Sequence, residues 1–301
     1  MTLKQFYYVL TISNAGGFAR AADMLNISQP SLSQYIKKIE KQLGVELFER
    51  IGGSVRLTDA GRVYIDAGRQ ILDIERRMVG QINDLTEHKT GTIMIGTSPY
   101  RSASMMPIIA KKFQEKYPGM HLVVEEMTSQ ELTEAAERGQ FDLCLTMRPI
   151  NERLFNCEKI ADEELIVAVP AAYPILSGIS MQNRKYSAVD ISEFKDQPFV
   201  MIKEGQWMQQ ALENLMFDQG VSLKKASIVK SLEAQIAMVR AGVGVALMPS
   251  GIERFCSSNE VRFYSLRQEL AKREVVVIWR KERALNLVTK ELLDIIKTIS
   301  W

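Results

Sequence analysis

The stretch from Gly17 to Gly44 constrains the chain most, because its apolar residues repeat at helical spacing on either side of a short break. The first repeat ends at Leu25, and Asn26–Ile27–Ser28 interrupts the pattern. The second repeat steps by 4, 3 and 4 residues and therefore shares one helix face: Leu32, Ile36, Ile39 and Leu43. The sequence therefore predicts two helices joined by a tight turn.

The outer face of the second helix is polar and basic. Ser28 or Gln29 can cap its start, and Pro30 falls in the first turn, where a missing N–H is harmless. The outward positions are Ser33, Gln34, Lys37, Lys38 and Lys41. Such a face suits a helix that enters the major groove of DNA. An ordinary helix pair with a solvated charged face would show the same pattern.

A short β-hairpin is predicted after this pair. Two strand-like segments, 45–50 and 55–58, flank Ile51–Gly52–Gly53–Ser54, and the glycines permit a tight turn. Arg50 and Arg56 flank the turn and could reach phosphates. A surface hairpin with two solvated arginines remains the alternative.

Charge and composition bound the class of protein. A chain of 301 residues with 46% hydrophobic and 25% charged residues is typical of a soluble protein of two or three domains. Residues 1–60 hold seven basic and five acidic residues, an excess that equals the whole formal net charge of +2. The excess therefore coincides with the predicted helix pair and favours, without deciding, a nucleic-acid partner.

The location expected for the chain is the cytoplasm. Its apolar runs are too short to span a bilayer, and no signal-peptide pattern follows Met1, so no membrane partner is expected. Cys144, Cys157 and Cys256 lie far apart, which suits a reducing compartment better than disulfides or a metal site.

Residues 59–86 predict one long helix. Its apolar residues follow a near-heptad stripe typical of a helix–helix seam: Ala60, Tyr64, Ala67, Ile71, Ile74, Met78, Ile82 and Leu85. A helix packed on its own domain would also explain the stripe. Residues 87–91 are expected to form a hinge.

Residues 2–62 resemble the winged helix-turn-helix of LysR-type transcriptional regulators. The matching motifs are Phe18-x-x-Ala21-Ala22-x-x-Leu25, Ile27-Ser28-Gln29-Pro30-Ser31-Leu32-Ser33, Ile36-x-x-Ile39-Glu40-x-x-Leu43-Gly44, Leu47-Phe48-x-Arg50 and Leu57-Thr58-x-Ala60-Gly61. The chain departs from the family pattern at Gly17, at Gln34 and at the uncharged hairpin tip, so base preference cannot be transferred.

The helix face and the resemblance together define the expected DNA contacts. The residues expected to contact base edges are Gln29, Pro30, Ser33 and Gln34. The residues expected to contact phosphates are Ser31, Lys37, Lys38, Arg50, Arg56 and Thr58. Ser28 is the remaining residue expected to contact DNA. The resemblance also implies that the long helix pairs two subunits, with a seam formed by Tyr64, Ile71, Ile74, Met78 and Ile82.

From Thr92 onward, strand and helix patterns alternate, which predicts an α/β fold with parallel-type sheets. The resemblance implies two lobes similar to a periplasmic binding protein. The expected fold class is therefore an N-terminal all-α winged helix-turn-helix domain followed by a two-lobed α/β domain. The expected domains are 1–58, 59–90 and 91–301; the first lobe would hold about 91–160 and 267–301, and the second about 161–266.

Ligands in open α/β sheets bind beyond the carboxyl ends of strands, against helix N-termini, where hydroxyls and free N–H groups favour an anion. The candidate effector-binding residues are Ser98, Pro99, Tyr100, Arg101, Thr128, Thr146, Met201, Ile202 and Lys203. The resemblance points to Ser98, Thr128 and 201–203. Plain helix capping explains Ser98 without a ligand.

The predicted function is a transcriptional regulator that binds double-stranded DNA and a small anionic effector. No cofactor, metal site or catalytic motif is expected. The resemblance implies a dimer or tetramer and allows RNA polymerase as a further partner. The alternatives are a solute-binding protein and an α/β enzyme with an accessory DNA-binding domain.

Overall fold

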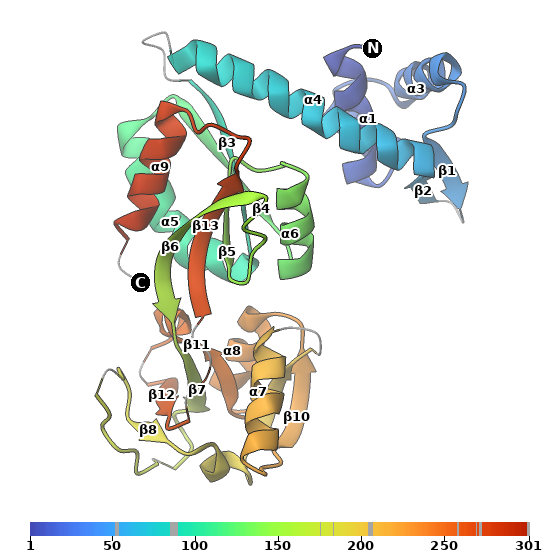
Figure 1. Ribbon diagram of the computed structural model, residues 1–301. Helices are drawn as coiled ribbons and strands as arrows, with labels where there is room; N and C mark the ends of the chain where they lie inside the picture. The colour runs from blue at the N-terminus through green and yellow to red at the C-terminus, as the bar shows by residue number, and fades with distance from the viewer. Residues whose placement is uncertain are drawn as a thin grey trace.

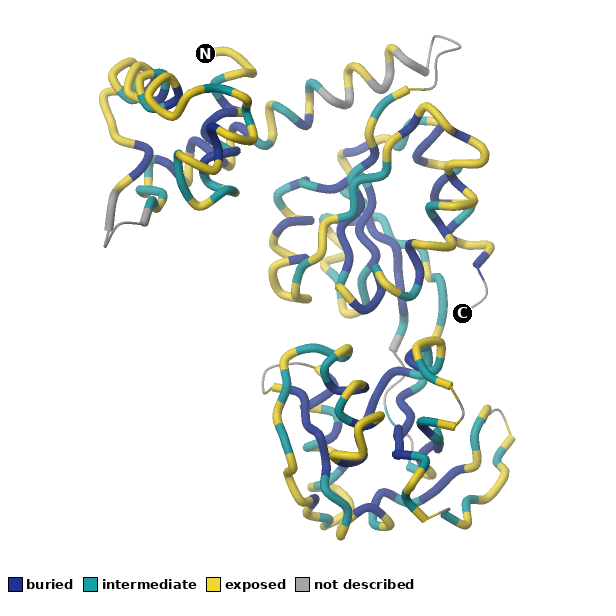
Figure 2. The backbone as a smooth tube through the Cα atoms, turned by 180° about the vertical axis from the view of Figure 1, so that it is seen from behind, coloured by how far each residue is buried: buried dark blue, intermediate teal, exposed yellow. Residues whose placement is uncertain are grey.

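The computed structural model describes residues 1–51, 54–84, 90–174, 176–182, 184–203, 207–257, 259–268, 270 and 273–299. Figure 1 shows an N-terminal head, one long helix and two α/β lobes, and each of these except the long helix has its own buried core in Figure 2. Within those ranges, no helix combines the length and the apolarity that crossing a membrane requires.

The N-terminal head contains the predicted helix pair. Its elements are α1 (Leu3–Ala15), α2 (Phe18–Met24), α3 (Gln29–Leu43), β1 (Phe48–Ile51) and β2 (Ser54–Leu57). Asn26 turns the chain between α2 and α3 with a φ of 52°, and Gly44 ends α3 in the left-handed conformation with a φ of 74°. The core includes side chains from α1, α2 and α3, with Val9, Ala21 and Leu32 fully buried.

Glu40 joins α3 to the hairpin. Its Oε1 accepts hydrogen bonds from the backbone N–H groups of Leu47 at 2.9 Å and Phe48 at 3.4 Å. Because the donors are the first residue of β1 and the residue before it, this one carboxylate fixes how the hairpin leaves the helix that would enter DNA.

Helix α4 (Asp59–Asp84) begins inside the head and then leaves it (Figure 1). Gly61 and Gly68 permit its close approach: a Cβ on Gly61 would lie 2.1 Å from the Leu47 carbonyl oxygen, and one on Gly68 would lie 2.7 Å from the Phe6 ring. The helix predicted over 59–86 is thus present to Asp84; residues 85–86 and most of the predicted hinge lie outside the described residues.

One residue of the predicted seam belongs to the head instead. Tyr64 is only 7% exposed, and its ring centroid lies 4.9 Å from that of Phe6. It therefore stabilises its own domain, and placing it on an exposed subunit seam was wrong. The pattern misled because the helical stripe continues from the head core into the exposed part of α4 without a break.

Lobe I is built on one sheet with the strand order β4-β3-β5-β13-β6. Its strands are β3 (Gly91–Thr97), β4 (Met120–Glu126), β5 (Leu143–Met147), β6 (Phe155–Glu163) and β13 (Arg273–Arg280). Its helices are α5 (Pro99–Lys116), α6 (Ser129–Glu137) and α9 (Leu287–Lys297). Helices α5 and α9 cover one face of the sheet and α6 covers the other (Figure 1).

Lobe II contains a sheet of order β11-β7-β12-β8 and a separate strand pair, β10-β9. Its strands are β7 (Leu165–Pro170), β8 (Ala188–Val189), β9 (Pro198–Ile202), β10 (Lys224–Val229), β11 (Ala246–Pro249) and β12 (Val261–Leu266). Its helices are α7 (Trp207–Asp218) and α8 (Leu232–Arg240), with the 3₁₀ turns η1 (Ile191–Phe194) and η2 (Ser250–Phe255). A bridge between Phe199 and Val245 connects the strand pair to the sheet.

The chain crosses between the lobes twice. It leaves lobe I after β6, which ends at Glu163, and returns between Leu266 and Arg273. Of the expected boundaries, the one at about 160 falls inside β6, and the one at 267 falls one residue after β12.

The sheets are mixed, whereas the sequence predicted parallel ones. Strands β4 and β5 are parallel to β3, but β13 is antiparallel to both β5 and β6. In lobe II, β11 and β12 are antiparallel to β7. Charged residues interrupt the apolar runs of β6 and β12; β6 lies at the edge of its sheet, where such residues stay partly exposed.

Candidate functional site

The predicted DNA-reading residues lie together on the outer face of α3. Ser28, Gln29, Pro30 and Ser31 are exposed at its start, while Leu32, Ile36 and Ile39 are buried on the opposite face. The same outer face continues through half-buried Ser33 and the exposed residues Gln34, Lys37 and Lys38. A protruding helix with this face has the shape and chemistry for the major groove.

Two serines at the start of α3 hold the helix end. The Ser28 Oγ accepts from the Ser31 backbone N–H at 3.3 Å, and the two hydroxyl oxygens are 2.8 Å apart. Ser28 is thus the N-cap, and Pro30 occupies the first turn as expected. Both hydroxyls remain exposed, so capping and contact with DNA are compatible.

The hairpin supplies fewer groups than the sequence predicted. Arg56 is exposed on β2, whereas the side chain of Arg50 and the turn residues Gly52 and Gly53 lie outside the described residues. Thr58 Oγ1 donates to the Glu46 carbonyl at 2.7 Å and accepts from the Gly61 N–H at 2.9 Å. Because its hydroxyl proton is donated to the Glu46 carbonyl, that proton is not available for the phosphate contact predicted for Thr58, and the contact itself stays a prediction.

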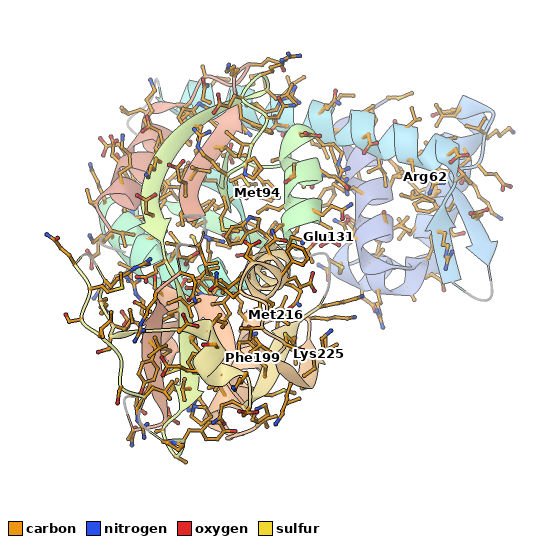
Figure 3. The ribbon with its side chains drawn as sticks, turned by 60° about the horizontal axis from the view of Figure 1, so that its bottom comes forward. Arg62, Met94, Glu131, Phe199, Met216 and Lys225 are labelled. Atoms are coloured by element: carbon orange, nitrogen blue, oxygen red, sulfur yellow. The ribbon has the colours of Figure 1, made fainter. Side chains whose placement is uncertain are left out.

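In lobe I, the predicted effector residues cap helices at the ends of strands. Half-buried Ser98 caps α5 by accepting from the Arg101 N–H at 3.4 Å, and exposed Pro99 follows it. Thr128 and Glu131 form a capping box at α6, labelled through Glu131 in Figure 3. The Thr128 hydroxyl and N–H hold the pKa of Glu131 below its usual value. Thr146 lies half-buried near the end of β5.

Tyr100 and Arg101 are engaged inside the protein instead of facing an open cleft. Their exposures are 6% and 4%, and both bond to Glu163: the Tyr100 hydroxyl at 3.3 Å and Arg101 Nη2 at 3.1 Å. The Tyr100 ring packs in an apolar cluster of lobe II. Both side chains are thus already bonded within the protein, and sequence patterns gave no sign of Glu163; their contact with an effector stays a prediction.

In lobe II, the candidates at the end of β9 differ in what they expose. Met201 and Ile202 are 1% and 3% exposed and pack in the lobe core with Phe199, which Figure 3 labels. Their side chains therefore belong to the lobe core, and their predicted place beside an effector stays a prediction. Lys203 is exposed, although its backbone N–H is bonded to the Val229 carbonyl at 2.8 Å.

Cysteine and metal chemistry has little support in the described part of the chain. No group of three or more His, Cys, Asp and Glu residues there could hold a metal ion. Burial raises the pKa of Cys144 to about 12, so its thiol stays protonated and unreactive at neutral pH.

Comparison with known proteins identifies both parts of the chain. Residues 3–62 match the family "Bacterial regulatory helix-turn-helix protein, lysR family", and residues 86–299 match "LysR substrate binding domain". The chain is 29% identical to the HTH-type transcriptional regulator BudR of Raoultella terrigena, over 93% of this chain and 95% of that protein.

Solved structures share the fold over the whole length. A full-length OxyR variant from Pseudomonas aeruginosa is 23% identical, with a TM-score of 0.71 over 100% of this chain and 99% of that one. Full-length CbnR, a chain solved in complex with its target DNA, is 20% identical, with a TM-score of 0.69 over 99% of each chain. These structures confirm the predicted fold class, a helix-turn-helix head followed by a two-lobed α/β domain.

The head with its exposed α3 face, the α/β lobes and the two family matches lead to one assignment. The chain belongs to the LysR family of transcriptional regulators, with a DNA-binding helix-turn-helix domain and an effector-binding domain.

Proposed function

We propose that α3 reads a specific operator in the major groove. The single observation that carries this proposal is its exposed row of amide, hydroxyl and ammonium groups opposite a fully apolar buried face. Gln29, Pro30, Ser33 and Gln34 would contact base edges. Ser31, Lys37, Lys38, Arg50 and Arg56 would contact phosphates and fix the position of the helix.

Two or more copies would act together, with α4 as the contact between them. The exposed part of α4 carries an apolar stripe: Ile71, Ile74, Met78 and Ile82 are 38%, 56%, 52% and 52% exposed. Side chains of this kind are stabilised when a second helix covers them. On this proposal residues 1–58 bind DNA, 59–90 join the subunits, and 91–301 respond to the effector.

The effector would be a small anion bound between the lobes. Support comes from Ser98 and Thr128, which lie at the starts of α5 and α6, and from the exposed Lys203 on the facing lobe. The protein would work in the cytoplasm by binding, without catalysis or a cofactor, and RNA polymerase would be its further partner on DNA.

The DNA proposal can be tested on a duplex selected from a random pool by the full-length protein. Replacing Gln29 and Ser33 with Ala should reduce discrimination between this duplex and random DNA, by about 1–3 kcal/mol for each lost base contact. Lys112→Ala, at an exposed position on α5, is the control. Unchanged discrimination by the double variant would disprove the groove assignment.

A further inference from the structure

A buried ion-pair cluster connects α4 to lobe I. Arg283, which follows β13, donates through Nη2 to Asp73 Oδ1 of α4 at 2.9 Å and also to Asp142 Oδ1. Its side chain is 6% exposed, and those of Asp73 and Asp142 are 12% and 13% exposed. One guanidinium is thus shared between carboxylates of two different parts of the molecule.

Backbone groups of lobe I hold Arg283 and Asp142 in place. Arg283 Nη1 also donates to the Phe141 carbonyl, and Asp142 Oδ2 accepts from the Met94 N–H at 2.6 Å. Met94 is labelled in Figure 3 within lobe I. Because backbone groups of lobe I fix Arg283 and Asp142, Asp73 is the member that can part from the others.

A second contact lies one turn earlier on the same face of α4. With the Gln140 amide oriented to satisfy its neighbours, its oxygen accepts from Arg69 Nη1 at 2.8 Å. Arg69 and Asp73 are four residues apart and therefore share one helix face. Burial lowers the pKa of Arg69, as expected for a guanidinium shielded from water at this contact.

Apolar packing does not add a shared core at this place. In the described residues, each apolar cluster belongs to the head or to the lobes, and none joins α4 to lobe I. A cavity of about 1230 Å³ lies there instead, lined by residues of α1, α4 and lobe I that include Leu72, Met78 and Phe141. The connection between α4 and lobe I therefore depends on hydrogen bonds and ion pairs of defined geometry, which lie beside this cavity.

The cluster lies at the opposite end of the lobe I strands from the predicted cleft. Asp142 immediately precedes β5, whereas Thr146 lies near its other end, four residues or about 13 Å further along. Figure 1 shows α4 passing over the end of lobe I where β3 begins. A shift of the sheet at the cleft would thus be transmitted to Arg283 and Asp142 as a rigid unit.

We propose that Asp73, Arg283 and Asp142 form a joint that sets the angle between α4 and lobe I, and that opening the Asp73 side releases α4. A buried ion pair confers orientation more than net stability, since desolvation offsets much of its attraction. That the joint also controls the spacing of paired DNA heads rests on the proposed function. A change at the cleft would then alter DNA geometry through this joint.

The first test needs neither DNA nor effector. Spin labels at Gln70 of α4 and Lys290 of α9, both exposed, report the distance between the two parts in full-length protein diluted with unlabelled chains. The native cysteines are replaced beforehand. Wild type should give one narrow distance distribution, and Asp73→Asn should broaden it or add a second distance.

A matched control separates the joint from a general loss of charge. Glu291→Gln breaks the exposed Lys116–Glu291 pair within lobe I and should leave the distribution narrow. Asp73→Ala, which removes the same carboxylate without leaving an amide in its place, is the second variant and is measured if Asp73→Asn does not fold. A distribution as narrow as that of wild type in a folded Asp73→Asn or Asp73→Ala protein would overturn the proposal.

The second test uses the selected duplex, with fluorophores at its two ends to report bending. Asp73 lies on α4, bonds to Arg283 of lobe I and is not one of the predicted DNA contacts, so Asp73→Asn should bind the duplex within about twofold of wild type while changing its end-to-end distance. Unchanged bending would disprove the control of DNA geometry but not the joint itself. Failure of wild type to select any duplex would instead count against the proposed function.

Discussion

Arg101 of lobe I and Glu163, the residue just before the chain enters lobe II, form a nearly buried ion pair. Arg101 Nη2 lies 3.1 Å from Glu163 Oε2, and the side chains are 5% and 11% exposed. The arginine that the sequence offers to an anionic effector is therefore already neutralised by the protein. An effector would have to take Arg101 from Glu163, or bind through other groups such as Lys203.

Removing the charge of Glu163 should destabilise the protein. Glu163→Gln leaves Arg101 buried without this counter-charge, so the free energy of unfolding should fall by about 1–3 kcal/mol. Urea unfolding measures this loss. The pair between exposed Lys116 and half-buried Glu291 provides the comparison, because Glu291→Gln should cost less than about 1 kcal/mol. Equal losses in the two variants would mean that the Arg101–Glu163 pair stabilises the protein no more than the Lys116–Glu291 pair does.

Tyr64 offers a test of the corrected α4 assignment. Its hydroxyl is buried without a hydrogen-bond partner among the described residues, and burial raises its pKa. Tyr64→Phe should therefore change the free energy of unfolding by no more than about 1 kcal/mol, whereas Tyr64→Ala should cost about 3–5 kcal/mol. Thermal or urea unfolding of the two variants measures both changes. A large loss in Tyr64→Phe would show that the hydroxyl has a role the packing does not reveal.

The exposed stripe of α4 should determine oligomeric state. Ile82→Glu places a charge on a side chain that is 52% exposed, and a covered seam cannot solvate that charge. Sedimentation should show dissociation to smaller species. Val243→Glu, a similar change at a 41% exposed position of lobe II, should leave the mass unchanged. If Ile82→Glu keeps the wild-type mass, the seam lies elsewhere.

Lys37 and Lys38 should contribute to DNA affinity without affecting sequence preference. Each phosphate contact releases counterions, so each Lys→Ala change should reduce the magnitude of the log–log slope of affinity against salt by about 1. Fluorescence anisotropy on the selected duplex at several salt concentrations gives this slope. Lys112→Ala should retain the wild-type slope, and a Lys37→Ala slope equal to it would remove Lys37 from the interface.

The sequence predicted the head well because its signals are local. The steps between Leu32, Ile36 and Ile39 define a buried face within a single helix, and the residues opposite are then exposed. The wing hairpin and α4 follow from similarly short patterns.

The cleft was predicted less well because its contacts are distant in sequence. Arg101 and Glu163 are 62 residues apart, and no periodicity connects them. Strand β9 is apolar throughout, so its pattern cannot tell that Met201 and Ile202 point into the core. The commitment of the Thr58 hydroxyl to Glu46 likewise depends on how the hairpin folds back.

The central claim, that α3 reads DNA in the major groove, is tested most directly by dimethyl sulfate protection of the selected duplex. Guanine N7 lies in the major groove, where a bound helix shields it. Wild type should protect guanines within the site, and the Gln29→Ala, Ser33→Ala variant should restore reactivity at one or more of them. Full reactivity of every guanine N7 in the wild-type complex would contradict the account.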